Sequence, residues 1–69
     1  MTEQNIIDAI KNDKHSLSSI INYISGYEAT KNPDNYSEVM DIAIKLKNEN
    51  KIKITNIGFC EYDIRFKGC

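Results

Sequence analysis

The sequence predicts an α+β fold, in which a three-helix bundle is followed by a C-terminal antiparallel β-hairpin. Apolar residues recur at helical spacing in three segments before residue 50, most regularly in residues 17–24. Residues 62–67 alternate strictly between apolar and polar side chains, which is typical of a half-buried strand, and residues 51–55 alternate in the same way. The chain contains no linker or internal repeat, so we expect one domain spanning residues 1–69.

Size and composition are those of a small globular domain. The 69 residues are 41% hydrophobic and 28% charged, and the net charge is −1. No apolar run approaches the roughly 18 residues of a membrane span. The N-terminus lacks the charged start and the long apolar stretch of a signal peptide. We therefore expect a soluble, cytoplasmic protein that does not enter a membrane.

The first two helices have recognisable starts and apolar faces. Thr2 can cap a helix over residues 3–12, with Glu3 in the first turn, where the helix dipole favours negative charge. Ser16 can cap the second helix, and Gly26 can end it because glycine tolerates a positive φ. The apolar faces are Ile6, Ile7 and Ile10 in the first helix and Leu17, Ile20, Ile21 and Ile24 in the second.

A polar connector, residues 26–35, leads to the third helix. Pro33 disfavours helical backbone at Asn32, and a short helical turn at residues 27–31 stays open. The third helix can start at Asp34, Asn35 or Ser37 and is expected to end at residues 48–50. Its inward stripe is Tyr36, Val39, Ile42, Ala43 and Leu46.

The hairpin register follows if all its alternating apolar side chains face the helices. The inward pairs are then Ile52 with Phe66, Ile54 with Ile64 and Asn56 with Tyr62, and the outward pairs are Lys51 with Lys67, Lys53 with Arg65 and Thr55 with Asp63. Like charges directly opposite each other are unfavourable by up to about 1 kcal/mol. Burying each large apolar side chain is worth about 1.5–3 kcal/mol, so burial decides the register. Gly58 lies in the loop of this hairpin, and Phe59 either folds back onto the helices, which we favour, or contacts a partner.

Charge is distributed unevenly along the chain. Residues 1–42 carry a net charge of −4, and residues 43–69 carry +3. In the predicted register, Lys51, Lys53, Arg65 and Lys67 form one cationic face. Such a face suits an anion, most simply a nucleic-acid phosphate. The alternative is a solvated face whose charges are offset by nearby acids.

Three helices followed by a hairpin, with the third helix running directly into the first strand, resemble the winged-helix domain. The resemblance lies in the stripe Val39, Ala43 and Leu46, in the junction KNENKI at residues 47–52 and in the closing strand YDIRF at residues 62–66. It implies that residues 35–50 are a recognition helix for the major groove and that residues 51–67 are a wing that contacts the DNA backbone. The chain departs from the family in its longer connector and in the outward carboxylates Glu38 and Asp41, which would repel phosphate.

Two functions fit these features. A DNA-binding regulator would hold phosphates with Lys51, Lys53, Arg65 and Lys67 and probe the groove with Ser37, Lys45 and Asn48. One small module offers few contacts, so homodimerisation is expected. The alternative is a protein-interaction module, such as a phage or mobile-element inhibitor of a host factor, with an interface of Glu38, Met40, Asp41, Ile44 and Phe59. We favour DNA binding because the resemblance and the cationic hairpin agree.

No arrangement of residues predicts catalysis, a metal site or a cofactor. Cys60 and Cys69 are nine positions apart, form no CxxC pair and have only His15 as a potential histidine ligand. Two reduced thiols are the favoured interpretation, with a disulfide or a dimer-linking thiol as the alternatives. We expect His15 to be an exposed residue beside the second helix cap. The protein is therefore expected not to be an enzyme.

Overall fold

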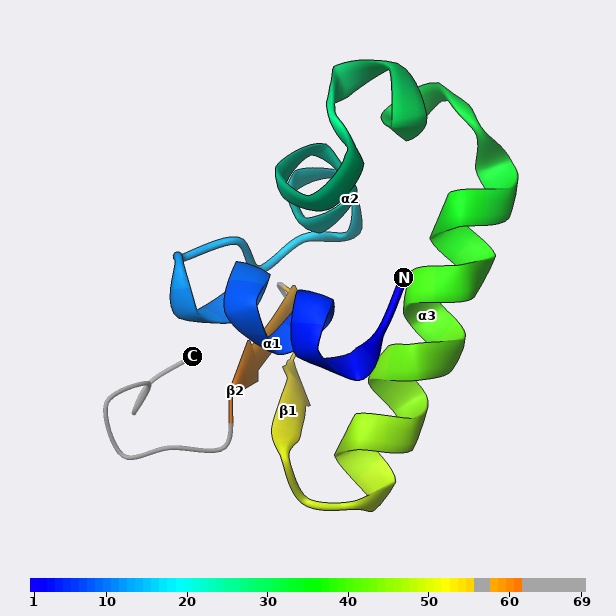
Figure 1. Cartoon of the computed structure of the whole chain (residues 1–69). Coiled ribbons are helices and arrows are strands. Elements are labelled where there is room, and N and C mark those ends of the chain that lie inside the picture. The colour runs from blue at the N-terminus through cyan, green and yellow to red at the C-terminus, as the bar shows by residue number, and fades with distance from the viewer. Residues whose placement is uncertain (56–57, 62–69) are drawn as a thin grey trace.

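The fold is a bundle of three α-helices followed by a two-stranded antiparallel sheet, as predicted (Figure 1). The computed structural model describes residues 1–55 and 58–61. The helices are α1 (Glu3–Lys11), α2 (Leu17–Ser25) and α3 (Pro33–Asn48), with a 3₁₀ helix η1 (Tyr27–Lys31) between α2 and α3. The strands are β1 (Ile52–Thr55) and β2 (Gly58–Glu61). In Figure 1, α1 lies across the hairpin, and α3 runs beside the other helices and ends next to β1.

Both predicted N-terminal caps form. The Thr2 hydroxyl accepts a hydrogen bond from the Asn5 amide at 3.2 Å, and the Asn5 side chain accepts one in return from the Thr2 amide. Ser16 and Ser19 repeat this reciprocal arrangement at the start of α2. Each cap therefore satisfies a backbone donor that an isolated helix start would leave unpaired.

The C-terminal ends of α1 and α3 share one local structure. Asp13 has a φ of 65° and Asn50 a φ of 61°, the left-handed region that Asp and Asn tolerate better than most residues. After each of them the chain turns back, so that the Lys14 amide donates to the Ala9 carbonyl and the Lys51 amide donates to the Leu46 carbonyl. The turn at Asn50 directs the chain from α3 into β1 without a longer loop.

The connector between α2 and α3 is more ordered than its polar sequence indicates. Residues of η1 form the short helical turn that the sequence left open, and Gly26 adopts a φ of 93° before it. The α3 helix begins earlier than predicted, with Asn32 as its cap and Pro33 as its first residue. Proline suits this position because its missing N–H would have no helical partner there.

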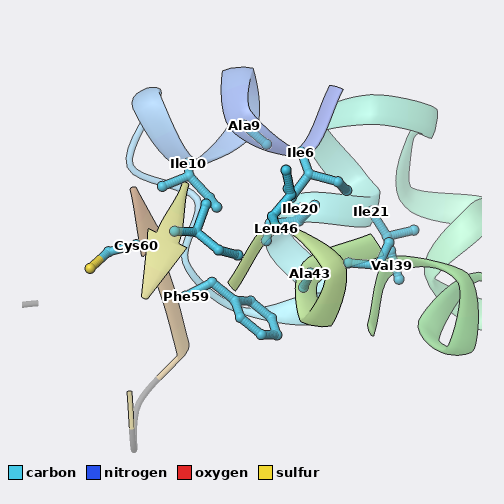
Figure 2. Packing of buried hydrophobic residues seen from close by; sticks show 11 residues of the cluster. Ile6, Ala9, Ile10, Ile20, Ile21, Val39, Ala43, Leu46, Phe59 and Cys60 are labelled. Atoms are coloured by element: carbon cyan, nitrogen blue, oxygen red, sulfur yellow. The ribbon is translucent and has the colours of Figure 1, made fainter. Parts of the chain in front are cut away.

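The core is one apolar cluster to which the three α-helices and both strands contribute (Figure 2). Its fully buried members include Ile6 and Ile10 from α1, Ile20 and Ile21 from α2, and Val39, Ala43 and Leu46 from α3. Tyr36 and Ile42, the other two residues of the predicted inward stripe, are half-buried and pack against this cluster. Burial of these residues supplies the main favourable term in folding.

The predicted hairpin register is wrong. The second strand is residues 58–61, so Ile52 pairs with Glu61 rather than Phe66, and Ile54 pairs with Phe59 rather than Ile64. Phe59 is only 4% exposed, whereas Ile54 is 40% exposed. The ring of Phe59 fills the core in place of Ile54, which confirms the prediction that Phe59 folds back onto the helices. The predicted strand at residues 62–67 lies outside the described residues.

His15 ties the α1–α2 connection to β2. The Phe59 amide donates to the His15 carbonyl at 2.7 Å, and the His15 ring contacts the Phe59 carbonyl through Nδ1, also at 2.7 Å. A carbonyl oxygen can only accept, so Nδ1 must carry the hydrogen. The prediction of an exposed His15 is therefore wrong, and its side chain is 33% exposed. These two contacts place the segment between α1 and α2 along the edge of β2 that faces away from β1.

Candidate nucleic-acid interface

Four exposed lysines lie at the junction between α3 and β1. Lys45 and Lys47 belong to the last turn of α3, and Lys51 and Lys53 flank the start of β1. We call these four residues the lysine junction. The helix dipole favours positive charge at the end of α3. The tight turn at Asn50 keeps all four lysines within nine residues of each other along the chain.

Glu3 of α1 reaches into the lysine junction. Its carboxylate lies 3.4 Å from Lys45 Nζ through Oε2 and 3.8 Å from Lys51 Nζ through Oε1. The Glu3 side chain is 35% exposed, and its Oε1 is buried without a hydrogen-bond partner among the described residues. Glu49 contacts Lys51 from the other side at 3.4 Å. Two of the four lysines are therefore partly neutralised within the protein.

The surroundings of Glu3 lower its pKa. Burial alone would raise the pKa of this carboxyl, but contacts with the side chains of Lys45 and Glu49 and the positive charges of Lys45 and Lys51 outweigh it. The net effect is a pKa below the ordinary value of 4.5. The ionised carboxylate is thus the form that the folded protein favours.

Replacing Glu3 by glutamine should remove a pH-dependent part of the stability. A lowered folded-state pKa stabilises the fold above the unfolded pKa near 4.5, and this contribution is lost as pH falls through the folded value. Urea unfolding across a pH series should show wild type more stable than Glu3→Gln at neutral pH, with the difference vanishing well below pH 4.5. The matched control is Asp41→Asn, since Asp41 is exposed and forms no ion pair within residues 1–55 and 58–61. An equal pH dependence for both variants would contradict the prediction.

Lys47 and Lys53 are the less neutralised half of the lysine junction. Neither forms an ion pair with any residue that the structure describes. Lys53 lies opposite Cys60 on β2, not opposite Arg65 as predicted. Lys47 is not among the predicted phosphate-binding residues, although the density of lysines over residues 45–53 is a signal for it. Arg65 and Lys67 lie outside the described residues.

The outward face of α3 carries the predicted groove residues. Ser37, Asp41, Lys45 and Asn48 are all exposed and follow one another at i, i+4, i+8 and i+11, which places them on one side of the helix. The structure therefore brings Ser37, Lys45 and Asn48 together, with the Asp41 carboxylate between them.

The five residues of the alternative protein interface do not form one open surface. Glu38 is half-buried, and its carboxylate pairs with the Met1 amino group, which donates a hydrogen bond to Oε2 at 2.9 Å. Met40 packs against the core. Phe59 is inside the core, so it is not available to a partner in this structure. Asp41 and Ile44 remain, and Ile44 is 45% exposed.

Comparison of the chain with protein-family models, with curated proteins and with solved structures finds no match. Across the described part of the chain, no group of three or more His, Cys, Asp or Glu side chains is arranged to hold a metal ion. Among the same residues, no helix has the length and apolar character needed to cross a membrane. Cys60 is buried, and Cys69 lies outside the described residues.

Proposed function

We propose that this protein is a small, non-enzymatic nucleic-acid-binding domain of the cytoplasm, which uses the lysine junction to hold phosphates. The observation that carries the proposal is that four exposed lysines fall within residues 45–53, where α3 meets β1. Lysines bind the phosphate backbone through charge, and release of counterions from the nucleic acid drives such binding. The chain as a whole has a net charge of −1, so the lysine junction is a local feature rather than the result of a basic composition.

The order of the elements supports a groove-and-backbone mode of binding to duplex DNA. In the winged-helix domains that this chain resembles, a helix enters the major groove and the hairpin after it contacts the backbone. Here α3 would present Ser37, Lys45 and Asn48, while β1 would bring Lys53 to a phosphate. Asp41 would stand among the groove residues and weaken base contacts. We therefore expect binding dominated by the backbone, with homodimerisation adding contacts.

Binding to random duplex DNA should depend steeply on salt. We expect measurable affinity at low salt, in the range of about 10⁻⁴–10⁻⁶ M typical of non-specific binding, which weakens as salt rises. The double variant Lys47→Gln with Lys53→Gln should flatten the slope of log K against log salt by about 2, because each lost phosphate contact contributes about 0.9. Fluorescence anisotropy with a labelled duplex measures both quantities.

The matched control removes the same charge elsewhere. Lys14 and Lys31 lie outside the lysine junction, and Lys31 pairs with Glu28 in the η1 segment. The double variant Lys14→Gln with Lys31→Gln should lower affinity much less than the junction variant. Equal losses would assign the effect to net charge alone, and no binding of the wild type at low salt would reject the proposal.

The exposed pair Asp41 and Ile44 supports a second candidate, a protein-interaction module. A half-exposed isoleucine beside a carboxylate without an ion pair among the described residues suits a partner with a basic, partly apolar surface. In a pull-down from the native host, Asp41→Lys and Ile44→Asp should each abolish capture of such a partner while circular dichroism stays unchanged. In the DNA assay, by contrast, Asp41→Lys should strengthen binding, so the two candidates predict opposite effects of one substitution.

A further inference from the structure

We propose that Glu3 is an internal competitor, which occupies the position of a phosphate between Lys45 and Lys51 until nucleic acid displaces it. The inference rests on the proposed function and adds a means of regulation to the same site. It starts from the convergence of two lysines from different segments on one carboxylate, at 3.4 Å and 3.8 Å. The Glu3 carboxylate lies between two ammonium groups, and a bound phosphate group would lie in the same position and contact the same two lysines.

The contacts of Glu3 are suited to displacement. The distance of 3.8 Å between Oε1 and Lys51 Nζ is longer than a hydrogen bond, and Oε1 has no hydrogen-bond partner among the described residues. Lys45 and Lys51 are exposed, so an outside anion can reach both without rearrangement of the core. A phosphate carries more acceptor oxygens than a carboxylate, so it can satisfy both lysines where Glu3 satisfies them incompletely.

The charges that face Glu3 explain why it would set the affinity. Lys45 approaches from α3, and Lys51 and Glu49 approach from the junction before β1. With Glu3 ionised, the two cations are balanced by two carboxylates. When Glu3 is neutral or displaced, one net positive charge is left for a phosphate. An incoming phosphate must therefore compete with Glu3 before it gains either lysine.

The test compares Glu3→Gln with Glu28→Gln, which removes the same charge from the exposed Lys31 pair away from the junction. Glu3→Gln should bind random duplex DNA at low salt about 3–10-fold more tightly than Glu28→Gln, with a slope against log salt steeper by about 1 to 2. In a Lys45→Gln background most of that gain should disappear, because Lys45 is one of the two lysines released. Circular dichroism checks that each variant is folded.

Equal affinities for Glu3→Gln and Glu28→Gln, with wild type binding DNA, would overturn the competitor and leave the proposed function intact. If wild type binds no DNA, the same variants are titrated with pyrophosphate while the amide signals of Lys45 and Lys51 are followed by NMR. Larger shifts in Glu3→Gln than in wild type would then support the competitor and reject nucleic acid as the ligand. No difference between the two proteins would reject the competitor as well.

Discussion

Replacing Gly58 by alanine is expected to destabilise the whole domain by about 3 kcal/mol or more, at the upper end of the range for overpacked sites. A Cβ at this position would lie 1.9 Å from the His15 carbonyl oxygen and 2.8 Å from its carbonyl carbon. Both are backbone atoms, so no side-chain rotation can relieve the clash. The strand would have to move away from His15, which would break the two contacts between His15 and Phe59 and withdraw the Phe59 ring from the core.

Gly26 provides the matched control for this prediction. Both glycines have a positive φ, 93° at Gly26 and 152° at Gly58, but a Cβ at Gly26 would meet nothing within 4 Å. With φ 93° and ψ 172°, Gly26 lies in a backbone region that is essentially restricted to glycine, so Gly26→Ala should cost only backbone strain, about 1–3 kcal/mol. Urea unfolding of both variants measures the difference, and NMR of the amide of Phe59 reports whether the hairpin stays attached. If Gly58→Ala is no less stable than Gly26→Ala, the close approach of His15 is not a constraint on the fold.

The helices could be predicted because their signals are local. The capping residues Thr2 and Ser16 and the apolar spacing of each helix lie within a few residues of the structure that they specify. The start of α3 was missed because three polar residues after Pro33 all looked like caps, whereas the proline itself begins the helix. Local signals thus gave the elements correctly and their boundaries less well.

The hairpin register could not be predicted, because it is decided by contacts between distant residues. The alternation in residues 62–67 is the cleaner strand pattern, and Gly58 resembles a loop residue. The His15 backbone, 43 positions before Gly58 in the sequence, comes so close to residue 58 of β2 that only a glycine fits there. No pattern within the hairpin itself reports that approach.

The candidate site could be predicted only in part, because some of its residues are neighbours in the sequence and others meet only in the folded chain. Lys45, Lys51 and Lys53 could be selected by charge, since they are close in the chain. The role of Glu3 could not, because the sequence shows only an acidic residue in a first helical turn. Its contacts with Lys45 and Lys51 depend on how α1 packs against α3. The predicted pairing of Lys53 with Arg65 failed together with the register.

Replacing Leu46 by alanine is expected to cost about 2–5 kcal/mol, the range for deleting a large buried aliphatic side chain. Leu46 is fully buried and belongs to the central cluster in Figure 2. A domain of 69 residues has a total stability of about 3–10 kcal/mol, so this loss would remove a large fraction of it. Thermal or urea unfolding followed by circular dichroism measures the change.

Ile44, two positions away on the same helix, provides the control. It is 45% exposed, so Ile44→Ala should change stability by no more than about 0.5–1 kcal/mol, partly offset by the better helix propensity of alanine. Equal costs for the two variants would mean that α3 does not pack as described.

Leu46→Ala also serves as an unfolding control for the DNA-binding assay, because Lys45 and Lys47 flank Leu46 in the chain. If Leu46→Ala loses DNA binding through unfolding, an osmolyte such as TMAO should restore the binding. The loss of binding in Lys47→Gln with Lys53→Gln should persist with TMAO, because that protein is folded.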